Sequence, residues 1–154
     1  MTYQNISQID RCGIVGYTFH VGDLFHRGHL HQLEQCRDFC DFLIVGVLTD
    51  QAVATYKRIP VIPYPWRAAI FDALEIVDMV VPQNARDPSG NIRILKPNVY
   101  FHGDDWPEIP GEEAIKELGG KLIRTTRLYD ITTTQIMKEV VDRVKREPES
   151  IWLY

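Results

Sequence analysis

Residues 20–29, HVGDLFHRGH, place three histidines and two glycines directly after an apolar run that predicts a buried strand. His26 and His29 are three apart, so their imidazoles face the same way on the first turn of a helix. Gly28 between them lets a bulky anion approach the backbone, and a helix N-terminus offers unpaired N–H groups. With Asp23 as the nearby carboxylate, this set suits a phosphate better than a metal. A pair of surface histidines without a function is the alternative from this stretch alone.

Composition limits the partners of such a site. The chain has 154 residues, 45% of them apolar and 25% charged, which suits one globular domain with a substantial core. The net charge of −4 argues against a general nucleic-acid or membrane-surface binder, because both surfaces attract basic proteins. A local cationic pocket for a small phosphorylated ligand remains compatible with this charge.

The same composition predicts a cytoplasmic protein without membrane insertion. No apolar stretch approaches the roughly 20 residues of a membrane span, and the first residues lack the layout of a signal peptide. Three cysteines cannot all pair within one chain, and Cys36 and Cys40 have no partner set at zinc-finger spacing. We therefore expect reduced thiols in the core.

Short apolar runs alternate with segments of helical period, which predicts βαβ units. Strands are expected over residues 12–19, 42–48, 77–81, 99–102 and 121–125, and helices over 29–40, 66–75, 112–118 and 133–146. Most of these strands lack polar alternation, as expected when helices cover both faces of a sheet. The fold class is a single Rossmann-like, doubly wound α/β domain (residues 1–154) with a mainly parallel five-stranded sheet.

Within this domain we expect a core over about 12–146 and a tail over 147–154, which could dock on a partner subunit or fray. Residues 49–65 and 82–90 are expected to be long loops, and such loops are often functional. The first helix would begin at the carboxyl end of the first strand, where open α/β sheets bind their ligands.

Four further segments accompany 20–29 in order along the chain. They are CDFLIVGVLTD (40–50), KRIPVIPYPWRAAIFDALEIVDMVV (57–81), KPNVYFHGDDW (96–106) and RLYDITTTQI (127–136). Together the five segments resemble the cytidylyltransferase-like nucleotidyltransferases, whose H-x-G-H signature is usually Gly-x-Phe-Asp-Leu-Leu-His-x-Gly-His. The segment 96–106 is most similar to glycerol-3-phosphate cytidylyltransferases.

This resemblance implies transfer of CMP from CTP to a small phosphorylated alcohol, glycerol 3-phosphate being the first candidate, with release of pyrophosphate. One alternative is an adenylyltransferase that uses ATP and a sugar phosphate or flavin phosphate. Another is a catalytically impaired relative that only binds nucleotide. The resemblance also implies Mg²⁺ with the triphosphate, without a metal site built from protein side chains, and a homodimer.

The resemblance assigns roles to individual residues. His26, His29, Lys57 and Arg127 would be catalytic: the histidines at the triphosphate, and Lys57 at the α-phosphate and the acceptor. The nucleotide- or phosphate-binding set would be Phe19, His20, Asp23, Gly28, Arg67, Gly103, Asp104, Ile131, Thr132, Thr133 and Thr134. For Arg67 a surface ion pair is the alternative, and Thr132 also fits a capping box with Gln135.

Three residues depart from the family's pattern. His20 stands where a glycine is usual, Gly22 where an aromatic residue is usual, and Asp130 adds a carboxylate near the expected phosphates. The pocket could be remodelled for another acceptor, His20 could join the phosphate contacts, or the site could be impaired.

Overall fold

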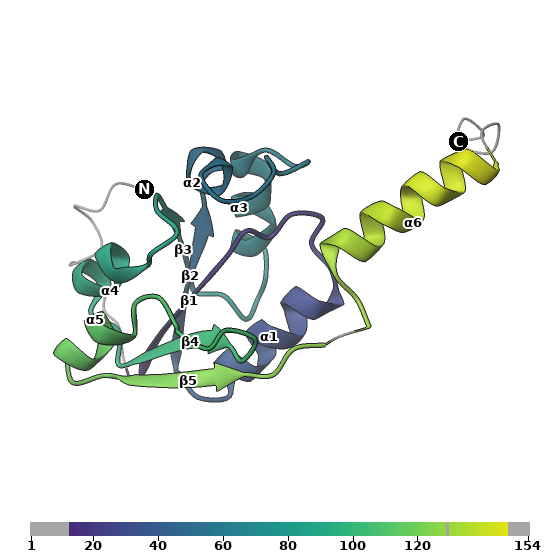
Figure 1. Ribbon diagram of the computed structural model, residues 1–154. Helices are drawn as coiled ribbons and strands as arrows, with labels where there is room; N and C mark the ends of the chain where they lie inside the picture. Colours follow the sequence, from purple (N-terminus) through teal and green to yellow (C-terminus); the bar gives the residue numbers. More distant parts are fainter. Residues whose placement is uncertain (1–12, 129, 148–154) are drawn as a thin grey trace.

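Five parallel strands form one sheet in the order β3-β2-β1-β4-β5. The computed structural model describes residues 13–128 and 130–147 (Figure 1). The strands are β1 (Val15–His20), β2 (Phe42–Leu48), β3 (Met79–Gln83), β4 (Val99–Gly103) and β5 (Lys121–Thr125). Central strands β1 and β2 are almost wholly buried, which explains their unbroken apolar sequences. The predicted Rossmann-like class and parallel sheet are confirmed.

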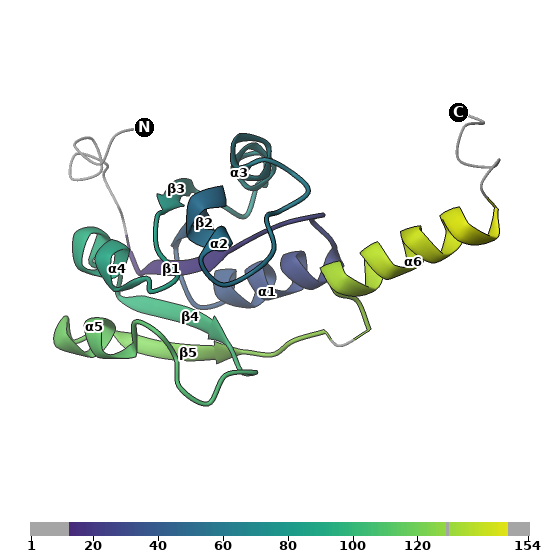
Figure 2. The ribbon, with the colours of Figure 1, turned by 45° about the horizontal axis from the view of Figure 1, so that its top comes forward.

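Helices cover both faces of the sheet (Figures 1 and 2). They are α1 (Arg27–Arg37), α2 (Asp50–Ala54), α3 (Tyr64–Asp72), α4 (Ser89–Leu95), α5 (Glu112–Glu117) and α6 (Thr133–Arg146). One core cluster joins α4 and α5 to the sheet through Ile92, Leu95 and Ile115. A second joins α1 and α3 to the other face through Leu33 and Phe71. The sheet is therefore doubly wound, as expected.

Two helices lie where loops were expected. Helix α2 falls inside 49–65: the Thr49 hydroxyl caps it by accepting from the Ala52 N–H at 3.3 Å, and Ala52 and Val53 are buried. Helix α4 begins inside 82–90 with residues that form helices poorly. Both helices are too short for their sequences to show a clear helical period of apolar residues, so their formation depends on tertiary packing.

Strand and helix ends shift by a few residues elsewhere. Helix α3 begins at Tyr64 rather than at 66, because Pro65 is tolerated in a first turn whose N–H groups have no partner in the helix. Strand β3 runs to Gln83 and includes Pro82. It is an edge strand, so the missing proline N–H costs no internal ladder bond.

Helix α6 extends away from the rest of the molecule (Figures 1 and 2) and buries none of its residues. Thr132 caps it as predicted, its hydroxyl accepting from the Gln135 N–H at 3.1 Å. Val140, Val141 and Val144 are exposed along it. Among the described residues, no helix is long and apolar enough to cross a membrane.

Cys36 and Cys40 are free and buried, as expected of core thiols. Cys12 and the tail residues 148–154 lie outside the described residues, so the expectations for them stay predictions.

Candidate functional site

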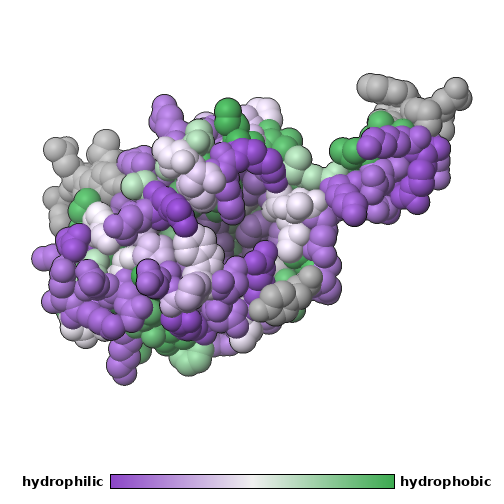
Figure 3. Space-filling view, in the orientation of Figure 1, coloured by the Kyte–Doolittle hydropathy of each residue, from purple (hydrophilic) through white to green (hydrophobic). Residues whose placement is uncertain are grey.

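A pocket of about 460 Å³ opens at the carboxyl ends of the strands. Strands β1 and β4 are neighbours there, although the chain leaves them toward opposite edges of the sheet, and such a switch point is where α/β sheets bind ligands. The surface is hollowed beside the base of α6 (Figure 3). The predicted site residues that line it are Phe19, His20, Asp23, His26, Gly28, His29, Lys57, Gly103, Arg127, Ile131, Thr132, Thr133 and Thr134. Two others, Arg67 and Asp104, do not.

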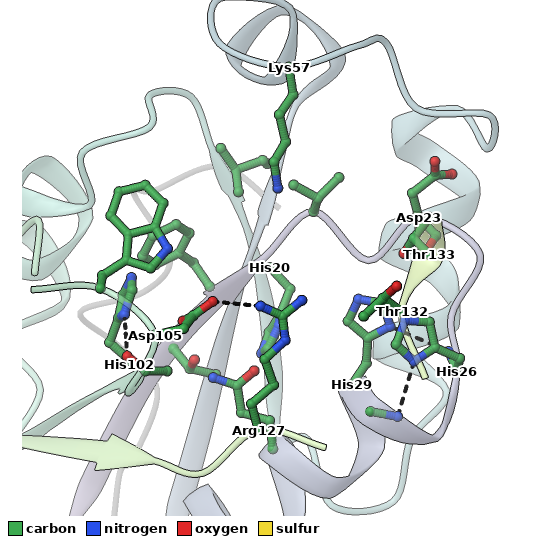
Figure 4. A pocket seen from close by; sticks show the side chains of 18 of the residues that line it. His20, Asp23, His26, His29, Lys57, His102, Asp105, Arg127, Thr132 and Thr133 are labelled. Carbon is green, nitrogen blue, oxygen red and sulfur yellow. Dashed lines mark hydrogen bonds and ion pairs between the residues drawn. The ribbon is translucent and has the colours of Figure 1, made fainter. Parts of the chain in front are cut away.

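His26 and His29 meet at the start of α1, where His26 is the N-cap (Figure 4). Their ring centroids are 4.1 Å apart. Nδ1 of His26 accepts from the Gly28 N–H at 3.0 Å, and Nδ1 of His29 accepts from the His26 N–H at 3.3 Å. In the neutral rings this places the proton on each Nε2. Among the described residues neither Nε2–H has a partner, so two N–H donors are available for an anion, and the capping bonds hold them in position.

Both histidines are neutral at pH 7. Burial, followed by the charge of Arg127, lowers the pKa of His26 below its ordinary value. Burial lowers the pKa of His29 to about 3, with His20, His26, Arg127 and Lys57 adding to the effect. The groups that disfavour a further positive charge are the groups that attract a polyanion. The electrostatics of the pocket therefore favour a ligand with several phosphates.

The start of α6 closes the pocket beside α1. Thr133 donates its hydroxyl proton to the Asp23 carbonyl at 3.0 Å, which ties α6 to the histidine-bearing loop. That hydroxyl was expected to face a phosphate, and its structural bond leaves the backbone N–H for that purpose. Gly28 is also required by packing, because a Cβ there would lie 2.8 Å from Cε1 of His26 and 3.3 Å from the Ile131 carbonyl oxygen. Two helix N-termini thus converge on one side of the pocket.

Asp23 holds the loop that carries Lys57. Its carboxylate accepts from the N–H groups of Val61 at 3.1 Å and Ile62 at 3.0 Å, and pairs with Arg58 at 3.2 Å. Burial alone raises the pKa of Asp23, but these three donors together hold it below its ordinary value. Asp23 therefore lines the pocket with its carboxylate engaged by the loop that carries Lys57.

Lys57 extends from this loop into the pocket (Figure 4). Burial, followed by the charges of Arg127 and Arg58, lowers the pKa of its ammonium group. A cation that is crowded by other cations gains when a phosphate enters.

Arg127 faces Lys57 from the segment after β5 and pairs with Asp105 at 2.6 Å. Both aspartates are exposed, but the adjacent Asp104, which was expected to line the pocket, does not line it. Its backbone N–H bonds to the Thr125 carbonyl, and this turn directs Asp105 inward. The sequence GDDW contains both aspartates, and the fold selects the second.

Arg86 was not expected from the sequence. It lines the pocket, and its guanidinium carbon lies 5.1 Å from the ring centre of Tyr56 and 4.6 Å from that of Trp106. Among the described residues, no ion pair involves Arg86. The two rings hold the cation in place and leave its N–H donors available. A single loop arginine carries no sequence signal for such a role.

Arg67 is placed differently from the prediction. It is fully buried on α3, and it donates to the carbonyls of Ile62 and Val21 and pairs with Asp50 at 2.6 Å. It does not line the pocket but holds the histidine-bearing loop and the Lys57 loop together. Neither the predicted phosphate contact nor the alternative of a surface ion pair describes this position.

We therefore expect Arg67→Ala to lower the free energy of unfolding by about 3 kcal/mol, because two carbonyls and a carboxylate lose a buried partner. Urea unfolding measures this, and Arg93→Ala, which removes an exposed arginine paired with Glu117, should change it by less than about 0.5 kcal/mol. Unchanged stability with weakened nucleotide binding would contradict the structural role and favour the phosphate contact.

Asp130 is exposed and does not line the pocket, so its carboxylate does not oppose a phosphate there. The two carboxylates that do line the pocket, Asp23 and Asp105, are both paired with arginines. Among the described residues, no group of three or more His, Cys, Asp or Glu side chains could hold a metal ion.

Comparison with known proteins also indicates a nucleotidyltransferase. The family model described as cytidylyltransferase-like matches residues 21–143. Among curated proteins, the bifunctional protein HldE of Methylococcus capsulatus is 37% identical over 123 residues, which cover 77% of this chain and 26% of that protein. HldE of Acidiphilium cryptum is 34% identical over 124 residues, 78% of this chain and 26% of that protein. The chain thus spans about a quarter of the length of these relatives.

Solved structures agree on the fold. The lipopolysaccharide core biosynthesis protein from Thermoplasma volcanium is 26% identical with a TM-score of 0.68, over 75% of this chain and 98% of that chain. Pantoate-beta-alanine ligase from Francisella tularensis, solved with beta-gamma ATP and beta-alanine, is 15% identical with a TM-score of 0.54, over 92% of this chain and 74% of that chain. The second likeness concerns the fold alone.

Proposed function

This chain belongs to the cytidylyltransferase-like family, and from that premise we propose that it transfers a nucleoside monophosphate to a small phosphorylated alcohol or sugar. The observation that carries the proposal is the pair of imidazole Nε2–H donors, fixed at the start of α1 and facing a pocket lined by Lys57 and Arg127. The pocket supplies donors and cations, as a reaction between phosphates requires.

In the proposed reaction an oxygen of the acceptor phosphate attacks the α-phosphorus of the triphosphate. The bond from that phosphorus to the oxygen bridging to the β-phosphate breaks, and pyrophosphate leaves. The acceptor phosphate is already anionic near pH 7, so no general base is required. Catalysis then consists of alignment and of stabilising the charge on the α-phosphate and the departing pyrophosphate.

The residues divide between these tasks. His26 and His29 donate to the triphosphate beside the N-termini of α1 and α6, where backbone N–H groups also point. Lys57 approaches from the opposite loop and serves the α-phosphate and the acceptor. Arg127 exchanges part of its pairing with Asp105 for a phosphate. Mg²⁺ would neutralise part of the triphosphate charge, held by the nucleotide rather than by a protein cage.

Two substrate pairs are candidates. CTP with glycerol 3-phosphate comes first from the sequence HGDDW, which resembles that branch of the family. ATP with a sugar phosphate is the second, because PVIP and the helix that follows it fit that branch equally well. Likeness to a lipopolysaccharide core biosynthesis protein supports a carbohydrate acceptor.

The test is pyrophosphate release with Mg²⁺, either CTP or ATP, and a panel of phosphorylated polyols and sugars. We expect release that requires both a nucleotide and an acceptor. Turnover with ATP and not CTP would select the second pair. Binding of nucleotide without turnover on any pair would contradict the proposed transfer and support the nucleotide-binding alternative.

We propose that Arg86 binds the acceptor phosphate together with Lys57, because it lines the pocket beside Trp106 and forms no ion pair among the described residues. We expect Arg86→Ala to raise the acceptor KM by about 10- to 100-fold, the weight of one charge-assisted hydrogen bond, and to leave the nucleotide Kd nearly unchanged. Steady-state kinetics and calorimetry measure the two quantities, with Arg93→Ala as the exposed-arginine control. Weakened nucleotide binding with an unchanged acceptor KM would assign Arg86 to the nucleotide instead.

The homodimer and the cytoplasmic location implied at the outset are also proposals. Light scattering of the purified chain would check the first. The two free thiols in the core support the second.

A further inference from the structure

His20 lies at the end of β1 on the floor of the pocket, and it is 7% exposed. Its Nε2 is buried and has no hydrogen-bond partner among the described residues. A buried polar atom without a partner costs about 1–3 kcal/mol, so such atoms are rare unless a water or ligand satisfies them. A position where the family usually has glycine therefore carries an unsatisfied imidazole beside the expected nucleotide.

The His20 ring is supported by packing against α3. Phe71 on α3 stacks on His20, with centroids 5.6 Å apart and planes 21° apart. Gly22 makes room for Phe71: its φ is +69°, and a Cβ there would lie 2.3 Å from the Phe71 ring. His20, Gly22 and Phe71 thus form one coupled arrangement, in which the glycine leaves the space that the Phe71 ring fills.

The same packing fixes His20 against His29. The two imidazoles pack edge to face, with ring centroids 5.9 Å apart and planes at 85° to each other. Phe25 stacks on His29 at 5.5 Å and meets Phe71 at 5.3 Å, so four rings close a cycle. Burial, followed by His102, lowers the pKa of His20 to about 4, so the ring is neutral at pH 7 and holds one donor and one acceptor. A rigid, neutral donor beside His29 requires no charge to be buried.

We propose that His20 is a third imidazole of the phosphate site and that its Nε2 donates to a phosphate oxygen next to the one bound by His29. This inference rests on the proposed function, because it takes the phosphates of the bound nucleotide as the hydrogen-bond partner of His20 Nε2. It accounts for the departure at position 20 as an added nucleotide contact rather than as damage to the site.

The test distinguishes the contribution of the His20 nitrogens from that of the packing of its ring. His20→Phe keeps an aromatic ring between Phe71 and His29 but removes both nitrogens. We expect it to weaken binding of an α,β-methylene nucleoside triphosphate by about 10- to 100-fold in calorimetry, as for loss of a hydrogen bond to a charged group. His31→Phe, on the same helix as His29 but outside the pocket lining, is the control and should bind as the unaltered protein does.

A second measurement uses the unaltered protein and so does not depend on whether a variant folds. In the unaltered protein with ¹⁵N-labelled histidine, the Nε2 resonance of His20 should shift when the analogue binds. Equal affinity of His20→Phe and the unaltered protein, or an unmoved His20 resonance with the analogue bound, would overturn the inference and leave the proposed function standing. If the folded, unaltered protein binds neither the CTP nor the ATP analogue, both are overturned.

Discussion

Replacing His29 by alanine is expected to lower kcat at least about 100-fold, as loss of a preorganised donor to a transition-state oxygen does. The reason is that Nδ1 of His29 accepts a hydrogen bond from the His26 N–H, whereas Nε2–H has no partner among the described residues and His29 lines the pocket. The ring is held by Phe25 and His20, so its position costs no reordering when the nucleotide binds. Rapid-quench measurement of the chemical step gives the effect directly.

The matched control is His31→Ala, which removes an imidazole from the same helix but not from the pocket lining. It should retain kcat within about twofold. Circular dichroism would establish that both variants fold, since the His29 ring also packs against neighbours. A His29→Ala variant that is folded and nearly as active as the unaltered protein would remove His29 from the mechanism.

Replacing Lys57 by alanine is expected to have an effect of similar size, about 100- to 1000-fold in kcat, with a smaller loss of nucleotide affinity. The ammonium group lies opposite His26 and His29, where the α-phosphate and the acceptor would meet (Figure 4). Neighbouring arginines already disfavour its charge, so an entering phosphate relieves that repulsion, and more so as negative charge develops. Single-turnover kinetics at saturating nucleotide would isolate the chemical step.

Lys116→Ala is the control for this variant, because Lys116 is an exposed lysine paired with Glu112 on α5. It should leave both rate and affinity unchanged. A loss of nucleotide affinity for Lys57→Ala with an unchanged single-turnover rate at saturating nucleotide would mean that Lys57 stabilises the ground state and the transition state alike, which contradicts a role at the reacting phosphate.

The histidine-bearing loop shows how far local sequence reaches. His26 and His29 meet at the start of α1 as predicted, but His26 is the N-cap with an extended backbone and His29 is the third helical residue, so a local capping box pairs them. The central strands β1 and β2 were predictable for a similar reason, since a strand buried on both faces needs an unbroken apolar run. Thr132 at the start of α6 follows the same logic of a local cap.

The aspartates and arginines show where local sequence stops. Asp104 and Asp105 are adjacent and identical in type, and the turn after β4 decides which of them reaches Arg127. Arg67 was expected at the phosphates, but the fold surrounds it with carbonyls and Asp50. Arg86 gave no signal, because its role comes from two rings that are distant in the sequence.

The sequence by itself therefore determined the fold class, the family and the two histidines at the helix start, since each depends on periodicity or on spacing within one segment. Only the tertiary structure decided which charged side chains reach the pocket and what supports His20. Those outcomes depend on contacts between segments far apart in the chain, such as His20 with Phe71 and Asp23 with Ile62, and no local pattern encodes them.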